Sequence, residues 1–262
     1  VDSFVEPDPN SDVACVFALK GAAKSVLNAY RTMGIRTLLF DKGLIRSSTG
    51  HGAPSGYLRV SIDEFMPLGR IERMMKEGVS AKRWIATGMR PKDRIDPRGD
   101  APVIYAGSSQ KYCDFHELGD EHEYAVDLIR KIRKATPKAR PIIYRPKPSY
   151  TLARRVDGTI FSRPPEMLGT MLPGAYALVT HGSHAAIDAI LGGVPAVVLG
   201  DGAARPVSST DLAVLEERPW YPGQERRFRW LAAISHFQYT IPEMTDGTMW
   251  RFLREEMEKP AV

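Results

Sequence analysis

The residues best suited to chemistry form a short polar loop, Thr180 to Ser183, between an apolar run of strand length and a stretch with helical apolar spacing. A helix that begins just past the carboxyl end of a strand presents unpaired N–H groups and a partial positive charge, which favour a phosphate. Gly182 lets the backbone come close to a ligand, and the hydroxyls of Thr180 and Ser183 can cap the helix or bind a phosphate oxygen. An ordinary turn in which Ser183 only caps a helix explains the same residues equally well.

Two more polar clusters follow predicted strands in the same half of the chain. Arg145 and Lys147 come after an apolar stretch of strand length, and both side chains can neutralise phosphate. Ser208 and Ser209 come after the predicted strand at 194–199, which follows the glycine loop, and they offer hydroxyl groups. Because ligands of open parallel sheets bind outside the carboxyl ends of the strands, the three clusters predict a site for the phosphates and ribose of a nucleotide.

In type and order, three motifs resemble the nucleotide-sugar half of capsule-polysaccharide-type glycosyltransferases of the GT-B fold: RPKP at 145–148, THGSHAAIDAILGGVPAVVLGDG at 180–202 and SSTDL at 208–212. The resemblance implies a nucleotide-sugar donor, for which we expect a UDP-sugar. It also implies the donor-phosphate contacts, made by Thr180, His181, Gly182 and Ser183 with help from Arg145 and Lys147. His184 stands where the family has a small residue, and the chain is far shorter than most capsule enzymes, so the acceptor is not carried over.

Glu243 and the pair His181 and His184 each have a functional and a routine explanation. In GT-B enzymes a glutamate near the start of a late helix often holds the donor ribose, and the resemblance implies this role for Glu243. A carboxylate at a helix start is equally well explained by the helix dipole. The two histidines have a spacing that suits a metal, but no third ligand follows at a suitable distance, so no metal is expected.

Strand and helix patterns alternate in both halves of the chain, which indicates an α/β fold with parallel sheets. Together with the resemblance, this predicts two facing Rossmann-like domains, as in GT-B enzymes. The prolines within residues 146–148 indicate a boundary. We therefore expect an acceptor-binding domain at 1–145 and a nucleotide-sugar-binding domain at 146–262, whose last helix packs back across. One-sided apolar spacing predicts an amphipathic helix at 121–135.

The first half is expected to hold the acceptor and the general base. Asp41 follows a predicted strand, where a carboxylate could take the proton of an acceptor hydroxyl. A plain turn at this position is the alternative. Basic side chains that could bind an acceptor lie near predicted strands and in a proline-rich cationic loop: Lys20, Lys42, Arg46, Arg59, Lys92 and Arg94.

The composition agrees with a globular protein that has an anionic partner. Apolar residues make up 43% of the chain, charged residues 26%, and the net charge is +5. No apolar run approaches the roughly 20 residues that cross a bilayer, and the first residues do not resemble a signal peptide. We therefore expect no membrane insertion and a cytoplasmic location. If a phage encodes the protein, this is the cytoplasm of the host cell.

The leading functional interpretation is a metal-independent glycosyltransferase that uses a nucleotide-sugar donor. Its basic charge and cationic loop favour double-stranded DNA with hydroxymethylated pyrimidines as the acceptor, as in phage DNA glycosyltransferases. A bacterial capsule or surface-polysaccharide glycosyltransferase with the same donor site is the alternative. A sugar-nucleotide isomerase or a binding module without catalysis is the third interpretation.

Overall fold

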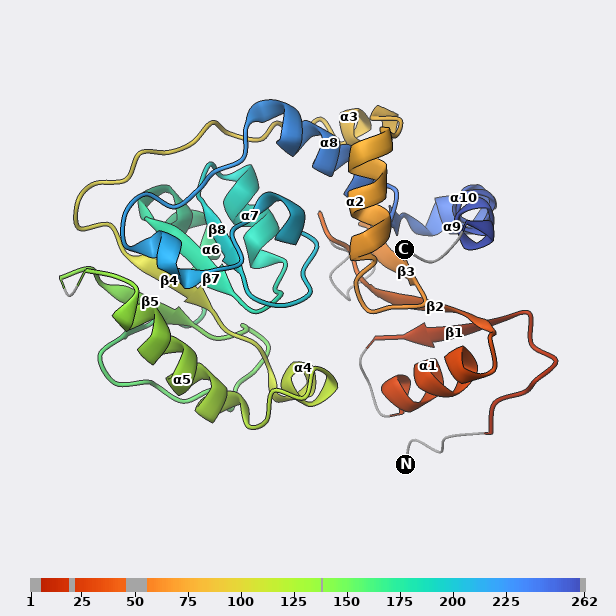
Figure 1. Ribbon diagram of the computed structural model, residues 1–262, viewed down its shortest axis with the longest axis horizontal. Coiled ribbons are helices and arrows are strands. Elements are labelled where there is room, and N and C mark those ends of the chain that lie inside the picture. The colour runs from red at the N-terminus through yellow and green to blue at the C-terminus, as the bar shows by residue number, and fades with distance from the viewer. Residues whose placement is uncertain (1–5, 19–21, 46–55, 138, 260–262) are drawn as a thin grey trace. The chain divides into compact units, whose positions relative to one another are not determined.

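The computed structural model of the chain describes residues 6–18, 22–45, 56–137 and 139–259 (Figure 1). The described residues form an α/β fold, as the sequence predicts. The fold divides into two compact units. Unit 1 contains residues 1–87 and 229–262, and unit 2 contains residues 88–228.

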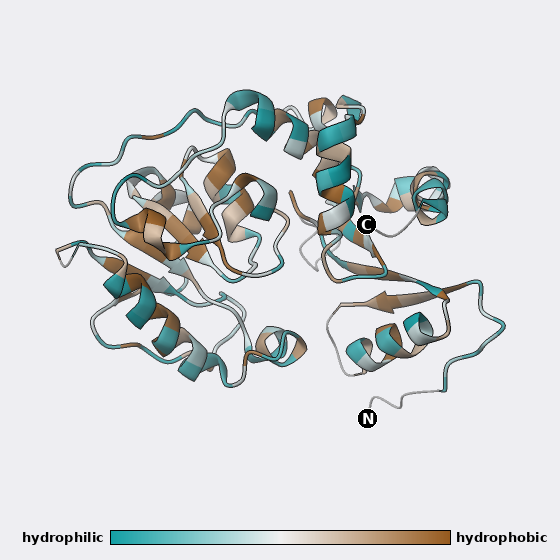
Figure 2. Cartoon of the chain, viewed as in Figure 1, coloured by the Kyte–Doolittle hydropathy of each residue, from teal (hydrophilic) through white to brown (hydrophobic). Residues whose placement is uncertain are grey.

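Unit 2 is built on a parallel five-stranded sheet with the strand order β6-β5-β4-β7-β8. Its strands are apolar along most of their length, as Figure 2 shows, which is typical of strands covered on both faces. The strands are β4 (Val103–Ala106), β5 (Ile142–Arg145), β6 (Ile160–Phe161), β7 (Ala177–Thr180) and β8 (Ala196–Val198).

Helices cover both faces of this sheet. Helix α5 (Glu121–Lys134) connects β4 to β5, and helix α7 (Ala185–Leu191) connects β7 to β8. The two connections lead in opposite directions from the middle of the sheet, so right-handed crossovers place α5 and α7 on opposite faces. The shorter helical elements are α4 (Gln110–Phe115), α6 (Leu168–Met171), η1 (Leu172–Gly174), η2 (Arg205–Val207) and η3 (Leu212–Leu215).

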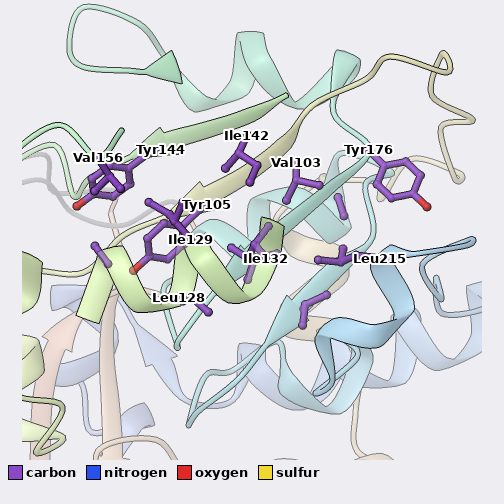
Figure 3. Packing of buried hydrophobic residues seen from close by; sticks show 14 of the residues in the cluster. Val103, Tyr105, Leu128, Ile129, Ile132, Ile142, Tyr144, Val156, Tyr176 and Leu215 are labelled. Carbon is purple, nitrogen blue, oxygen red and sulfur yellow. The ribbon is translucent and has the colours of Figure 1, made fainter. Parts of the chain in front are cut away.

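A hydrophobic core of unit 2 lies between α5 and the sheet (Figure 3). Helix α5 buries Ala125, Leu128, Ile129 and Ile132, which share one helix face, so the predicted amphipathic helix is confirmed. The helix begins after Asp120, whose carboxylate accepts hydrogen bonds from the N–H groups of the first turn. The helix packs on alternate residues of the strands, among them Val103, Tyr105, Ile142, Tyr144, Ala177 and Val179.

Unit 1 contains a mixed four-stranded sheet with the order β1-β2-β3-β9. Strands β1 and β2 are parallel, whereas β3 runs antiparallel to both β2 and β9. The strands are β1 (Val13–Phe17), β2 (Arg36–Lys42), β3 (Leu58–Ile62) and β9 (Gln238–Tyr239). The helices are α1 (Ala23–Thr32), α2 (Leu68–Glu77), α3 (Lys82–Ala86), α9 (Ile241–Thr245) and α10 (Thr248–Glu258), and α8 (Gln224–Ser235) crosses the division between the units.

A buried carboxylate joins α10 to α2 within unit 1. Glu256 is 1% exposed and accepts hydrogen bonds from Arg73 and Lys259. Its backbone carbonyl accepts a hydrogen bond of 2.9 Å from Nη1 of Arg70. Burial of a carboxylate costs several kcal/mol unless cations and donors offset the loss of hydration. The last helix is therefore held by specific partners as well as by the apolar contacts of Leu253.

The division into units differs from the expected boundary after Arg145. Strands β4 and β5 belong to the same sheet as β7 and β8, so residues 88–145 lie in unit 2. The end of the chain, from residue 229, returns to unit 1, where β9 pairs with β3. The proline-rich segment after Arg145 is a loop inside unit 2, because prolines end a strand without marking the end of a core.

The expectation of parallel sheets holds for unit 2 and not for unit 1. The sheet of unit 1 is mixed, because β3 and β9 each run antiparallel to a neighbour. Apolar patterning along a strand does not encode the direction of its partner. Within the described parts of both units, no helix has the length and apolar character needed to cross a membrane.

Candidate functional site

Four strands of unit 2 end in one row across the sheet. Ala106 pairs with both Arg145 and Thr180, and Thr180 pairs with Val198. The loops after these four residues therefore leave the same carboxyl edge of the sheet, where ligands of open parallel sheets bind. Ser209 joins the same edge through its bridge to Val197. The structure thus brings together the three clusters that the sequence places after strands.

The hydroxyl groups of the glycine loop are engaged by the protein. Thr180 is completely buried, and its Oγ1 donates a hydrogen bond of 2.9 Å to the carbonyl oxygen of Ala106. The same oxygen accepts a bond of 3.2 Å from the N–H of Ser183. The hydroxyl of Ser183 in turn accepts from the N–H of Ala185, also at 3.2 Å. Thr180 therefore positions the loop, and Ser183 accepts a bond at the start of α7, the capping role that the sequence left as an alternative. The expected contacts of both residues with a donor phosphate stay predictions.

The glycines of this edge allow two loops to pack tightly. A Cβ atom on Gly182 would lie 2.3 Å from Oη of Tyr112 and 2.6 Å from the carbonyl oxygen of Asp201. A Cβ atom on Gly200 would lie 2.1 Å from Nε2 of His181. Both distances are far below a van der Waals contact. The close approach that we expected Gly182 to offer a ligand is thus made here by Tyr112 and the neighbouring loop.

His181 lies in a cluster of aromatic side chains from two helices. Its Nδ1 is 2.7 Å from the hydroxyl of Tyr124 on α5. Its ring also contacts Tyr112 and His116, with centroids 6.0 Å and 5.9 Å away. Tyr112 and His116 lie one helical turn apart and stack on each other at 4.2 Å. The imidazole is therefore fixed in orientation, with Nε2 next to the Cα of Gly200.

Burial sets the protonation states of this cluster. It lowers the pKa of His181 below its ordinary value, against a smaller opposing effect of Asp201. It also raises the pKa of Tyr124 to about 12. Both groups are consequently neutral near pH 7. In the tautomer in which Nδ1 accepts from the Tyr124 hydroxyl, the imidazole carries its proton at Nε2 and can donate it to an anionic oxygen; in the other tautomer, Nδ1 donates to that hydroxyl.

Arg145 supplies a buried cation at the end of β5. The residue is 8% exposed, and its Nη1 donates to Oγ of Ser162 at 3.1 Å. Burial lowers the pKa of the guanidinium, but an arginine stays charged in a protein. Lys147, two residues later, is exposed. The structure thus places a buried, charged donor next to the row of strand ends, and the expected contact of Arg145 with a donor phosphate stays a prediction.

Ser208 and Ser209 stand at the turn after β8. The hydroxyl of Ser208 donates a bond of 2.7 Å to the carbonyl oxygen of Ala204, so it stabilises the η2 turn. Ser209 makes backbone hydrogen bonds with Ala196 and Val198. Both residues are partly exposed. These contacts are structural, and the role expected of both serines toward a donor stays a prediction.

The expected general base, Asp41, lies at the end of β2 in unit 1. Its side chain is 25% exposed, and one oxygen is 3.3 Å from Nη2 of Arg59. The other oxygen accepts a bond of 2.8 Å from the N–H of Lys42, which is itself exposed. Arg59 has no exposed surface and lies over the ring of Phe65. Arg59 therefore orients Asp41 from inside the core, and this burial does not support the acceptor contact expected of it.

Glu243 also lies in unit 1, at the start of α9. It forms a capping box with Thr240 and an ion pair of 2.5 Å with Arg83. Burial alone would raise the pKa of this carboxyl, but hydrogen bonds from Arg83 and Thr240 outweigh it and hold the pKa below its ordinary value. The helix-start explanation is therefore observed, and a contact with the donor ribose stays a prediction.

The remaining basic residues expected at an acceptor divide into three groups. Lys92 is exposed in a loop of unit 2. Arg94 in the same loop donates to the carbonyl oxygen of Pro219 at 2.8 Å and pairs with Asp96, so it holds two loops together. Lys20 and Arg46 lie outside the described residues.

The sequence analysis missed the aromatic partners of His181. Tyr112 and His116 follow β4, and Tyr124 lies on α5, more than fifty residues before the glycine loop. The one available signal was that Tyr112 and His116 are four residues apart after a predicted strand end. No group of three or more His, Cys, Asp or Glu side chains in the described ranges is arranged to hold a metal ion.

No protein-family model and no curated protein matches the sequence. Two solved structures of KpsC from Thermosulfurimonas dismutans do resemble the fold. One, a beta Kdo 2,4 transferase, is 12% identical with a TM-score of 0.53, and the match covers 92% of this chain and 87% of that one. The other, a beta Kdo 2,7 transferase, is 13% identical with a TM-score of 0.55, and the match covers 93% and 85%.

This likeness confirms the α/β, GT-B-like fold. At 12% and 13% identity it carries no residue assignments. Neither matched protein is named as an enzyme that modifies DNA, so the expectation of a double-stranded DNA acceptor receives no support from this likeness.

Proposed function

We propose that this protein is a glycosyltransferase that moves a sugar from a nucleotide-sugar donor to a glycan acceptor, as in the synthesis of a bacterial capsule or surface polysaccharide. Unit 2 holds the donor in this proposal. The fold likeness to two Kdo transferases supports this proposal over transfer to DNA.

The observation that carries the proposal is the row of strand ends in unit 2. Arg145, Ala106, Thr180 and Val198 pair across four adjacent strands, so their loops share one edge. This edge carries the buried guanidinium of Arg145 and the oriented imidazole of His181. A cation and a neutral N–H donor suit the phosphate of an activated sugar, which becomes more negative as the glycosidic bond to the nucleotide breaks.

The roles of the side chains follow from the chemistry of the transfer. The acceptor oxygen forms a bond to the anomeric carbon, the bond from that carbon to the phosphate oxygen breaks, and the nucleotide leaves with the electron pair. Arg145 balances the charge of the leaving phosphate, and His181 donates a hydrogen bond from Nε2. The proton of the acceptor hydroxyl needs a base, for which Asp41 is our candidate because its carboxylate is partly exposed and held by Arg59.

Donor binding is tested with a thermal-shift screen of UDP-, GDP-, CMP- and dTDP-sugars. A ligand at 100 times its dissociation constant adds about 2.7 kcal/mol of stability. For a chain of this length, that corresponds to a rise of several degrees in the melting temperature. We expect one nucleotide class to stabilise the protein, and the sugar-free nucleotide to retain much of the effect.

Two variants locate the response at the row of strand ends. His181→Gln and Arg145→Lys are expected to reduce the shift, because each alters a donor to phosphate. Arg90→Gln removes an exposed charge from a loop of unit 2 and is expected to leave the shift unchanged. If no nucleotide stabilises the wild-type protein, or if all three variants respond like the wild type, the proposed donor site is wrong.

A further inference from the structure

A groove with a volume of about 390 Å³ runs along helix α5 in unit 2. Residues of the glycine loop and of the β5 end do not line it. One wall comes from a single face of α5 and the other from the loop before β6. The lining residues are His122, Val126, Ile129, Arg130 and Arg133 on the helix, and Arg155, Val156, Asp157 and Gly158 on the loop.

The groove is elongated. The helical lining residues extend from His122 to Arg133, which spans about 16 Å at 1.5 Å per residue. They share one face of α5, whereas Tyr124, two residues after His122, points to the opposite face toward His181. The groove is therefore separate from the site that contains His181.

Three arginines give the groove a positive charge. Arg155 is exposed, and no ion pair involves it within the described parts of the chain. Arg130 is 68% exposed, and its ion pair among the described residues is with Asp127, an exchangeable surface contact. Arg133 is fixed by bonds to the carbonyl oxygens of Arg140 and Gly158. Asp157 is the one carboxylate among the lining residues, so positive charge is in excess.

The lining of the groove has an apolar part and carries no stacking surface for bases. Its apolar residues are Val126, Ile129 and Val156. No Phe, Tyr or Trp is among the lining residues, whereas single-stranded nucleic acids are bound by stacking on such rings. A duplex is wider than a groove along one helix and would touch only its rim. A single polymer chain, unlike a duplex, fits within the groove. Each carboxylate on such a chain can bind an arginine guanidinium through both of its oxygens.

We infer that this groove binds an extended glycan made of acidic sugars. Sugar carboxylates pair with Arg130 and Arg155, and the C–H faces of the rings lie on Val126 and Val156. This inference rests on the proposed glycosyltransferase function and gives it a polymer class, an anionic polysaccharide held along the face of α5 that points away from Tyr124.

The test uses a fluorescent hexamer of α2,8-linked sialic acid and the whole chain, with anisotropy measured at low salt, where screening is weak. We expect binding of the hexamer and no competition by neutral maltohexaose. The double variant with Arg130→Gln and Arg155→Gln should bind at least about tenfold more weakly, since charged hydrogen bonds are lost. Lys134→Gln removes a charge from the exposed side of the same helix and should bind like the wild type.

Three results would overturn the inference: no hexamer binding at low salt, equal affinities of the double variant and Lys134→Gln, or tighter binding of a short DNA duplex that the double variant abolishes. The last result would instead support a nucleic acid as the acceptor. The nucleotide screen is a separate readout. Glycan binding without any nucleotide response contradicts the proposed donor site alone, and a nucleotide response without glycan binding contradicts this inference alone.

Discussion

The hydroxyl of Tyr124 lies 2.7 Å from Nδ1 of His181, and this contact ties helix α5 to the glycine loop of unit 2. The two residues are 57 positions apart in the chain. The contact fixes the imidazole ring, whose Nε2 occupies the space that a Cβ atom on residue 200 would need. Tyr124 is thus a positioning residue for His181 in the proposed donor site.

Replacement of Tyr124 by phenylalanine should weaken nucleotide binding more than it weakens the fold. The change keeps the ring and removes one hydrogen bond, which contributes about 1 kcal/mol to stability. His181 then loses its orientation, so the melting shift caused by the nucleotide should fall. Urea denaturation and the thermal-shift response measure the two effects. Tyr30→Phe, which removes an exposed hydroxyl bonded to the N–H of Asp8, is the control and should change neither by much. An unchanged nucleotide response in Tyr124→Phe contradicts the positioning role.

Gly200→Ala should destabilise the protein by about 1–3 kcal/mol, the usual cost of overpacking. The new methyl group would lie 2.1 Å from Nε2 of His181, so the ring has to move away from Tyr124. Gly169→Ala is the matched control, because a Cβ atom there meets nothing within 4 Å and the residue lies in helix α6. Thermal and urea denaturation compare the two. Equal stability of both variants would show that the contact between the loops is loose.

The stability of the protein should fall as the pH drops through the mildly acidic range, in part because of His181. Its pKa is lowered in the folded state by burial, so the unfolded chain binds a proton first, near the ordinary pKa of about 6.5. This contribution is present above that pH and is lost below it. Burial also lowers the pKa of His236, so this residue makes the stability fall over the same pH range. The free energy of unfolding should therefore decrease less between about pH 7.5 and 5.5 in His181→Gln than in the wild type. A larger decrease in the variant would reverse the assigned sign.

Glu256→Gln should destabilise unit 1 by about 3 kcal/mol, because it leaves Arg73 beside a neutral amide in a buried position. The exposed partner Lys259 contributes little to this value. Glu258→Gln, two residues later on the exposed side of α10, should change the unfolding free energy by less than about 0.5 kcal/mol. Chemical denaturation of the two variants separates a specific buried interaction from a general loss of negative charge.

Part of the candidate site could be predicted from local sequence. The loop after β7, the basic pair after β5 and the amphipathic helix α5 each have a pattern within about fifteen residues, and the structure has these elements at the predicted places. The hydrogen-bond partners of the hydroxyl groups in the glycine loop could not be predicted from local sequence. Thr180 can face a ligand or the backbone of Ala106, and only the neighbouring strand decides between them.

The amino-acid sequence by itself determined the alternation of strands and helices, the helix face that α5 buries, and the polar loops at the ends of β5 and β7. These features depend on side-chain periodicity and on residues near one another in the chain. The tertiary structure alone decided that β4 and β5 share a sheet with β7, that the sheet of unit 1 is mixed, and that Tyr124 meets His181. Such relationships depend on which strands pair and on which distant side chains fill the remaining space, and neither choice is written in a local pattern.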